Sequence, residues 1–173
     1  ILGDANSTAV LAGGKLGAGV SQVEVDRRRE SAPGLPAAST IEASHDGYAA
    51  RFGLVHRRTL SLSDDGTLLA GEDLLVPSGR KARSGRVSYA LRFHLGPGVE
   101  AEVDEANVAR LDLPDGSSWA FVVDGGTVEL DESMWVDGDG LPHATRQLVV
   151  QGLVSRGGDS FAWMFEKLGT GVE

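Results

Sequence analysis

The chain has 173 residues, 41% hydrophobic and 24% charged, which is long enough for one domain with a buried core and unlike a disordered protein. It contains no cysteine, which excludes disulfides, thiolate chemistry and cysteine-ligated metal sites. Its net charge of -9 and the absence of any apolar run of membrane-spanning length lead us to expect neither a nucleic-acid partner nor membrane insertion.

The first quarter of the chain reads as turns and short extended segments. Residues 13–17, GGKLG, have the composition of a phosphate-binding loop but lack its GKS or GKT ending and a following helix, so they predict a turn. Residues 30–36, ESAPGLP, predict a loop. The chain begins at Ile1, inside a strand-and-turn pattern and without a signal-peptide pattern, so we expect it to be a C-terminal fragment of a longer protein.

Apolar and polar residues then alternate with a period of two, which is typical of half-buried strands. The alternation recurs in residues 54–62, 87–95, 108–113, 119–123, 128–130 and 161–165. Gly- and Asp-rich turn signals separate these runs, and 24 glycines are a poor composition for helices. With about a dozen such strands and no linker, we predict one all-β domain over residues 1–173, a large antiparallel two-sheet β-sandwich with few or no helices.

The two halves of the chain differ in charge. Residues 1–98 hold 12 Lys and Arg against 10 Asp and Glu, whereas residues 99–173 hold 4 against 15. An anionic ligand would therefore have to be met by the N-terminal half, which carries arginines at residues 27–29, 51, 57 and 58. For residues 27–29 taken alone, the pattern favours a solvated strand face.

Residues 44–58, SHDGYAARFGLVHRR, concentrate two His, one Tyr and three Arg. These side chains can abstract a proton, return one and neutralise a carboxylate. Gly47 interrupts the strand, so we expect His45 and Tyr48 at a bend, where functional side chains are often redirected. A plain solvated turn is an equally good interpretation.

In strand geometry His56 and Arg58 share one face of residues 54–62, and Arg57 lies on the other. Because that first face also carries leucines, we expect Arg58 to form a structural ion pair with Glu72 or Asp73 of the next strand. His56 and Arg57 then remain as candidates for ligand contact.

The sequence predicts no metal and no other cofactor. Residues 137–140, DGDG, lack the remaining ligands of a calcium loop and instead predict a hairpin turn. The four histidines show no metal-type spacing, and His94 and His143 read as structural residues of strands.

Residues 44–76, SHDGYAARFGLVHRRTLSLSDDGTLLAGEDLLV, resemble the C-terminal β-sandwich region of bacterial heparinase II/III-like proteins. The opening residues, ILGDANST, resemble the stretch that follows the His-Asn/Ser-Thr strand of that family. The resemblance covers nearly the whole chain and is most specific in residues 44–73. In that family the sandwich follows an α-helical toroid, and uronic-acid polysaccharides are cleaved by β-elimination in the cleft between them.

The resemblance implies that the parent protein is a polysaccharide lyase of the periplasm or cell envelope, with an acidic polysaccharide and an N-terminal helical domain as partners. It also implies what this chain lacks. The family's Gly-His-x-Asp segment, the Tyr and the Asn or His of the toroid, and the zinc-binding His and Asp of some members all fall outside it. We therefore expect no established catalytic residue here and no lyase activity from the 173-residue chain.

What carries over is a set of candidate substrate-binding residues: His45, Tyr48, His56 and Arg57. In the cleft interpretation Arg57 offsets the uronate carboxylate, while His45 or Tyr48 hydrogen-bonds sugar hydroxyls. The alternative is a non-catalytic carbohydrate-binding or structural sandwich module of an envelope protein. Convergence of His45, Tyr48 and Arg57 on one concave surface would favour the cleft.

Overall fold

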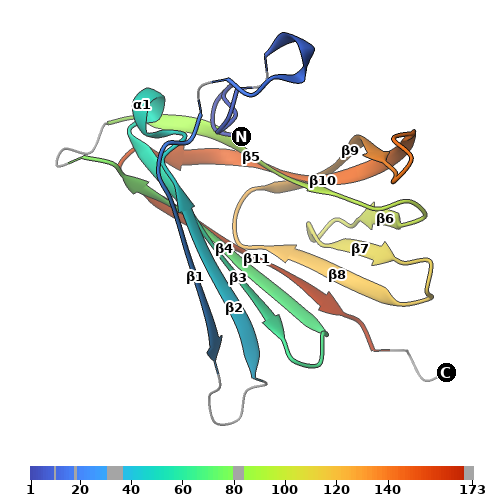
Figure 1. Cartoon of the computed structure of the whole chain (residues 1–173). Coiled ribbons are helices and arrows are strands. Elements are labelled where there is room, and N and C mark those ends of the chain that lie inside the picture. The colour runs from blue at the N-terminus through green and yellow to red at the C-terminus, as the bar shows by residue number, and fades with distance from the viewer. Residues whose placement is uncertain (10, 18, 31–36, 80–83, 170–173) are drawn as a thin grey trace.

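The computed structural model describes residues 1–9, 11–17, 19–30, 37–79 and 84–169 (Figure 1). The loop expected at residues 30–36 therefore lies, apart from Glu30, outside the described residues. Its strands are β1 (Val23–Glu30), β2 (Ala38–His45), β3 (Leu54–Ser63), β4 (Leu68–Pro77), β5 (Arg86–His94), β6 (Glu100–Val103), β7 (Ala109–Asp112), β8 (Ser118–Val123), β9 (Thr127–Val136), β10 (Pro142–Ser155) and β11 (Asp159–Lys167).

The strands form two antiparallel sheets, which confirms the predicted all-β sandwich. The large sheet has the order β1-β2-β3-β4-β11-β8-β7-β6, and the small sheet has the order β5-β10-β9. The last strand, β11, lies between β4 and β8 and so joins the N-terminal and middle parts of the chain into one sheet (Figure 1). Helical structure in the described residues is confined to the 3-10 turn η1 (Ala12–Gly14) and the one-turn helix α1 (Ala49–Phe52).

The core lies between the inner faces of the two sheets, because the alternation of each strand turns one set of apolar side chains inward. The small sheet contributes Leu148 and Val150, both fully buried, and the large sheet contributes Phe121 and Trp163. Phe93 of β5 packs between them, with its ring centroid 5.0 Å from Phe121 and 4.7 Å from Trp163.

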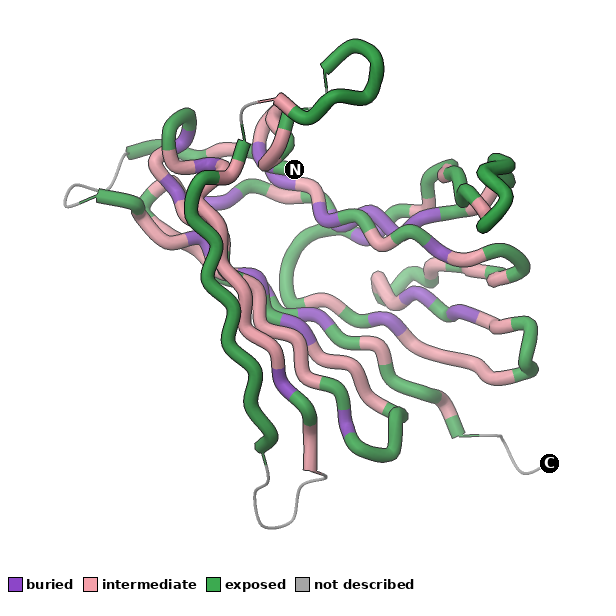
Figure 2. The backbone as a smooth tube through the Cα atoms, in the orientation of Figure 1, coloured by how far each residue is buried: buried purple, intermediate pink, exposed green. Residues whose placement is uncertain are grey.

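Gly71 of β4 leaves room for the indole ring of Trp163. A Cβ atom at this position would stand 2.2 Å from the indole ring, which no real structure tolerates without movement. The small sheet covers only part of the inner face, and every residue of β1 is exposed (Figure 2).

The chain between β2 and β3 reverses direction in a short turn, which hydrogen bonds stabilise at its beginning and at its end. Asp46 accepts hydrogen bonds from the Ser21 hydroxyl and from the backbone N–H groups of Ser21 and Gln22, which lower its pKa to about 2. Gly53 ends α1 in the left-handed conformation, with φ 75° and its N–H bonded to the Ala49 carbonyl. This turn fixes Tyr48 beside the end of β3.

Two further segments in which the sequence predicts turns lie elsewhere in the chain. Residues 137–140 join β9 to β10, with the Asp137 N–H bonded to the Leu141 carbonyl. Gly13 and Gly14, the first two residues of the GGKLG segment, belong to η1. In the part of the chain that the structure describes, no helix is both long and apolar enough to cross a membrane.

Candidate functional site

A cavity of about 420 Å³ opens between the ends of β2 and β3 and the edge of β5. Its lining includes three histidines, two arginines and two tyrosines: His45, Tyr48, His56, Arg58, Tyr89, Arg92 and His94. Asn6 and Ser7 line it as well. No aspartate or glutamate of the described residues lines it, although the chain as a whole carries a net charge of -9. We call this cavity the basic pocket.

A row of hydrogen bonds runs behind the basic pocket from the β2 end into the core. The Gly47 N–H donates to His45 Nδ1 at 3.2 Å, and His45 Nε2 lies 3.1 Å from His56 Nδ1. His56 Nε2 in turn lies 2.5 Å from Asp73 Oδ1. The cross-strand pairing of His45 with His56 brings the two rings to a centroid distance of 5.0 Å.

The direction of these hydrogen bonds fixes which nitrogen of each ring carries the proton. Because Gly47 donates to Nδ1 of His45, the neutral ring carries its proton on Nε2 and donates it to His56 Nδ1. His56 therefore carries its own proton on Nε2 and donates it to the Asp73 carboxylate. With these tautomers every ring nitrogen is engaged, so neither ring presents a free lone pair to the pocket.

Asp73 is the hub that ties three strands of the large sheet together. Its carboxylate, which has no exposed area, accepts bonds from Arg58 Nε at 2.8 Å, Arg58 Nη2 at 3.0 Å and the Trp163 indole N–H at 2.9 Å. Burial by itself raises the pKa of Asp73, but the hydrogen bonds from His56 and Arg58 outweigh it and hold the pKa below its ordinary value. Asp73 is therefore a fully satisfied buried anion.

Arg58 and Tyr48 each keep a polar group free for a ligand of the basic pocket. Arg58 uses Nε and Nη2 on Asp73, and its Nη1 makes no hydrogen bond within the described residues. The Tyr48 hydroxyl likewise has no hydrogen-bond partner in the described part of the chain, and burial raises its pKa, so it keeps its proton at neutral pH. The site thus offers a fixed cation and a phenolic donor.

Burial favours the deprotonated, neutral form of His45, whereas it favours the protonated, neutral form of Tyr48. Burial, followed by the neighbouring His56 ring, lowers the pKa of His45 below its ordinary value of 6.5. Its ring also packs against Tyr48 at a centroid distance of 5.4 Å. His45 therefore shapes the pocket wall as a neutral ring.

The structure separates the sequence candidates into two groups. His45, Tyr48 and His56 meet in the basic pocket, whereas Arg57 points to the opposite face of the large sheet, 3.4 Å from Glu42. Arg58 pairs with Asp73, and Glu72 lies on the other face, exposed. Of the adjacent Arg57 and Arg58, it is thus Arg58 that lines the pocket, a residue that the sequence presented only as structural.

Sequence reasoning did not select Arg92 and His94 of β5. Arg92 Nη1 lies 3.5 Å from Asp131, and His94 Nδ1 bonds the Ser133 hydroxyl at 2.7 Å. The period of two places both on one face of residues 87–95, but no local signal shows that this strand edge lies beside β3. The β5 side of the pocket therefore depends on how strands far apart in the sequence pack together.

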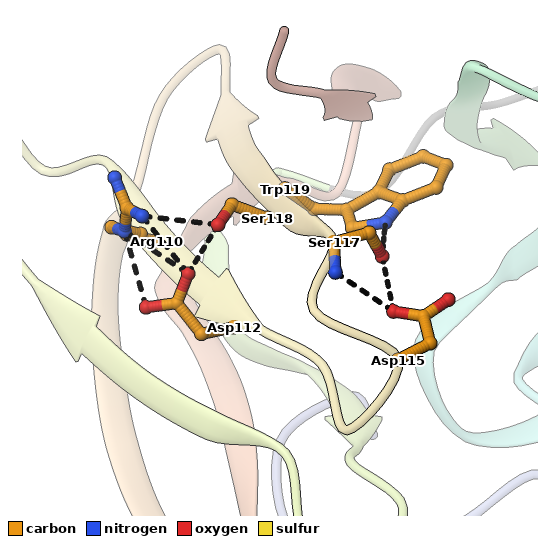
Figure 3. A network of polar contacts seen from close by, with 6 residues as sticks. All are labelled: Arg110, Asp112, Asp115, Ser117, Ser118 and Trp119. Carbon is orange, nitrogen blue, oxygen red and sulfur yellow. Dashed lines mark hydrogen bonds and ion pairs between the residues drawn. The ribbon is translucent and has the colours of Figure 1, made fainter. Parts of the chain in front are cut away.

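A second polar network, the hairpin network, lies at the turn between β7 and β8 (Figure 3). Arg110 bonds Asp112 through Nε and Nη2 at 3.0–3.2 Å, and Ser118 bonds both of them. Asp115 accepts from the Ser117 N–H and hydroxyl, and the Trp119 indole N–H donates to Ser117. These bonds stabilise an exposed hairpin.

The described residues contain no group of three or more His, Cys, Asp or Glu side chains arranged to hold a metal ion.

The fold and the pocket define an all-β sandwich with a cationic site at the junction of its sheets. The model of the heparinase II/III-like C-terminal family matches residues 1–164, and the chain belongs to this family. No curated protein sequence matches the chain.

Among solved structures, the heparinase III BT4657 gene product superposes with a TM-score of 0.60 at 13% identity, which shows a shared fold. The match covers 84% of this chain and 22% of that one, so this chain corresponds to about a fifth of the length of its relative. The GH36 α-galactosidase AgaA from Geobacillus stearothermophilus matches at 13% identity over 95% of this chain and 30% of its own, with a TM-score of only 0.44.

Proposed function

We propose that this chain is the β-sandwich of a heparinase II/III-like lyase that cleaves uronic-acid-containing polysaccharide by β-elimination, and that its part is to bind the acidic sugar. The observation that carries the proposal is the basic pocket, which gathers two arginines and three histidines without a lining carboxylate in the described residues. A sugar carboxylate is the ligand that such a lining recognises.

β-Elimination at a uronate needs a cation on the carboxylate, a base for the proton next to it, and an acid for the departing glycosidic oxygen. Arg58 Nη1 and Arg92 supply the first requirement. Tyr48, which keeps its proton at neutral pH, donates a hydrogen bond to a sugar oxygen. The 173-residue chain therefore meets the binding requirement of the reaction.

The base is the missing component. His45 and His56 have both ring nitrogens engaged along the row to Asp73, so accepting a proton would break a hydrogen bond already made. In the proposal the base and the full acid come from a helical domain of the parent protein that closes over the basic pocket. The 173-residue chain by itself then binds the polysaccharide and does not cleave it.

Binding is tested by titrating the chain with a heparan sulfate tetrasaccharide, an alginate oligosaccharide and a neutral glycan. We expect the two acidic ligands to bind with an affinity that falls as salt rises, because the contacts are charge-assisted. Arg92→Gln should weaken binding about tenfold, the loss expected from one charged hydrogen bond. The matched control is Arg57→Gln, which lies on the opposite face and should bind like the wild type. Equal affinity for the neutral glycan, or no binding at all, would contradict the proposal.

Catalysis is tested separately by following the ultraviolet absorbance of unsaturated uronate during prolonged incubation with the same ligands. We expect no increase over buffer from the 173-residue chain. A steady increase that disappears in Tyr48→Phe would show that this chain holds a complete active site, and would refute the division of roles proposed above.

A further inference from the structure

The inner face of the large sheet continues beyond the basic pocket along β1, β2 and β3. Alternation on β1 turns Val23, Val25, Arg27 and Arg29 to this face, because their partners in β2 belong to the inner set that includes His45. Val23 and Val25 are 65% and 59% exposed, and Figure 2 shows β1 exposed along its length, away from the small sheet. This stretch of the face is uncovered.

A groove of about 580 Å³ occupies this surface. Its inner-face walls combine arginines, aliphatic side chains and a serine: Arg27, Arg29, Ser39, Ile41, Leu60 and Leu62. None of the described aspartates and glutamates lines it. We call it the inner-face groove.

The inner-face groove and the basic pocket are consecutive on the same strands. On β3, His56 and Arg58 of the pocket are followed on the same face by Leu60 and Leu62 of the groove. On β2 the residue opposite Arg58 is Ala43. Its small side chain does not form a barrier between the pocket and the groove. A ligand chain that leaves the pocket along the strands therefore enters the groove.

The two faces of this end of the sheet carry opposite charge. The outward positions hold five carboxylates: Glu24, Asp26, Glu30, Glu42 and Glu72. Arg28 and Arg57, also outward, lie 3.8 Å and 3.4 Å from Glu42. The inward acid of β1 to β4 is Asp73, which is fully buried and fully bonded. A polyanion is thus attracted to the inner face and repelled by the outer one.

The groove arginines differ in how free they are. Arg29 forms an ion pair with Asp64 of the β3–β4 turn. Arg27 makes no ion pair or hydrogen bond with any described residue. Arg27 is therefore the cation that is available to a ligand in the inner-face groove. Arg29 can contribute less, because it is already paired with Asp64.

We propose that the inner-face groove is a second binding subsite, which holds the sugar residues that flank those in the basic pocket. In this arrangement Arg27 contacts an anionic group of the flanking sugars, while Leu60 and Leu62 remove the apolar faces of the sugar rings from water. The proposal rests on the proposed function, because it extends the same acidic polysaccharide along β1 to β3.

The test compares ligand length. We expect the wild-type chain to bind a heparan sulfate dodecasaccharide about tenfold more tightly than the tetrasaccharide, since the longer chain reaches one further charged contact. The double variant Arg27→Gln/Arg29→Gln should lose that gain and keep the tetrasaccharide affinity. Arg57→Gln, an outward arginine of the neighbouring strand, should keep both. Because β1 is exposed, unfolding midpoints should confirm that all variants fold alike.

The outcomes separate the two proposals. If the tetrasaccharide binds but length brings no gain, or the double variant keeps the gain, the inner-face groove is not a subsite and the basic pocket stands. If the tetrasaccharide does not bind, the proposed function fails, and the extension fails with it. If light scattering shows self-association that Leu62→Glu abolishes, a second copy of the chain covers the groove, which overturns the glycan subsite.

Discussion

Two arginine–aspartate networks in this domain use nearly the same bonds in opposite surroundings. Arg58 grips Asp73 through Nε and Nη2 at 2.8 and 3.0 Å, and Arg110 grips Asp112 through the same atoms at 3.0–3.2 Å. The Asp73 side chain has no exposed area, whereas that of Asp112 is 43% exposed. The two networks therefore differ in their access to solvent.

Because Asp112 is exposed, solvent can replace a hydrogen bond that is lost there. The hairpin network therefore orders the turn but contributes little to the free energy of unfolding. The Asp73 carboxylate has no exposed area, and the anion is stable only because His56, Arg58 and Trp163 all donate to it. The two bonds to Asp73 fix the orientation of the Arg58 guanidinium, which lines the basic pocket. Burial thus converts an ordinary ion pair into a positioned binding group.

Among substitutions in the two networks, Asp73→Asn should cause the largest loss of folding stability. Removing the buried charge leaves Arg58 without its counter-ion and His56 with a weaker acceptor, at a cost of about 3 kcal/mol, tempered by the partial exposure of Arg58. For a chain of this size that lowers Tm by about 10 °C. Asp112→Asn should leave Tm unchanged in the same calorimetric scan. Equal shifts in the two variants would mean that burial does not distinguish the networks.

A smaller effect is expected from the two indoles. Trp163→Phe removes the N–H that bonds Asp73 at 2.9 Å and part of a buried ring, which should cost about 2 kcal/mol in the free energy of unfolding. Trp119→Phe removes a 3.3 Å bond to Ser117 at the hairpin and should cost clearly less. Urea unfolding of both variants measures the difference, and a larger loss for Trp119→Phe would reverse the comparison.

The smallest effect is a dependence of stability on pH. The pKa of His45 is lowered on folding, so below its ordinary value of 6.5 the unfolded chain takes up a proton that the folded chain does not, and stability falls on acidification. Asp73, whose pKa is also lowered, adds a second fall below 3.8.

In His45→Gln the upper fall of stability should disappear while the lower one remains, as followed by urea unfolding between pH 8 and pH 3. The hairpin carboxylates Asp112 and Asp115 have lowered pKa values and contribute only to the lower range. An upper fall of unchanged size in His45→Gln would assign it to another group.

The period of two and the turn signals were sufficient to predict the all-β sandwich, because alternation reports locally which residues face a core. The same reasoning placed His56 and Arg58 on one face and paired Arg58 with the strand that follows, since hairpin neighbours are adjacent in sequence. It also correctly indicated a bend at Gly47.

It failed where contact depends on strands far apart in the chain. Trp163, 90 residues from Asp73, completes the hub only because β11 inserts beside β4. Arg92 and His94 join the basic pocket only because β5 of the other sheet ends beside β3. No local pattern encodes which strand will be a neighbour, since many pairings satisfy the same alternation.

The sequence by itself determined the fold class, the family and the residues from which a site could be made, because composition, period and motif are local properties. Only the tertiary structure decided that Arg58 and not Arg57 faces the basic pocket, and that His45 and His56 are joined in a row of hydrogen bonds to Asp73. The reason is physical: the side of a sheet that becomes buried, and the donors that a buried carboxylate finds there, are set by packing of the whole chain.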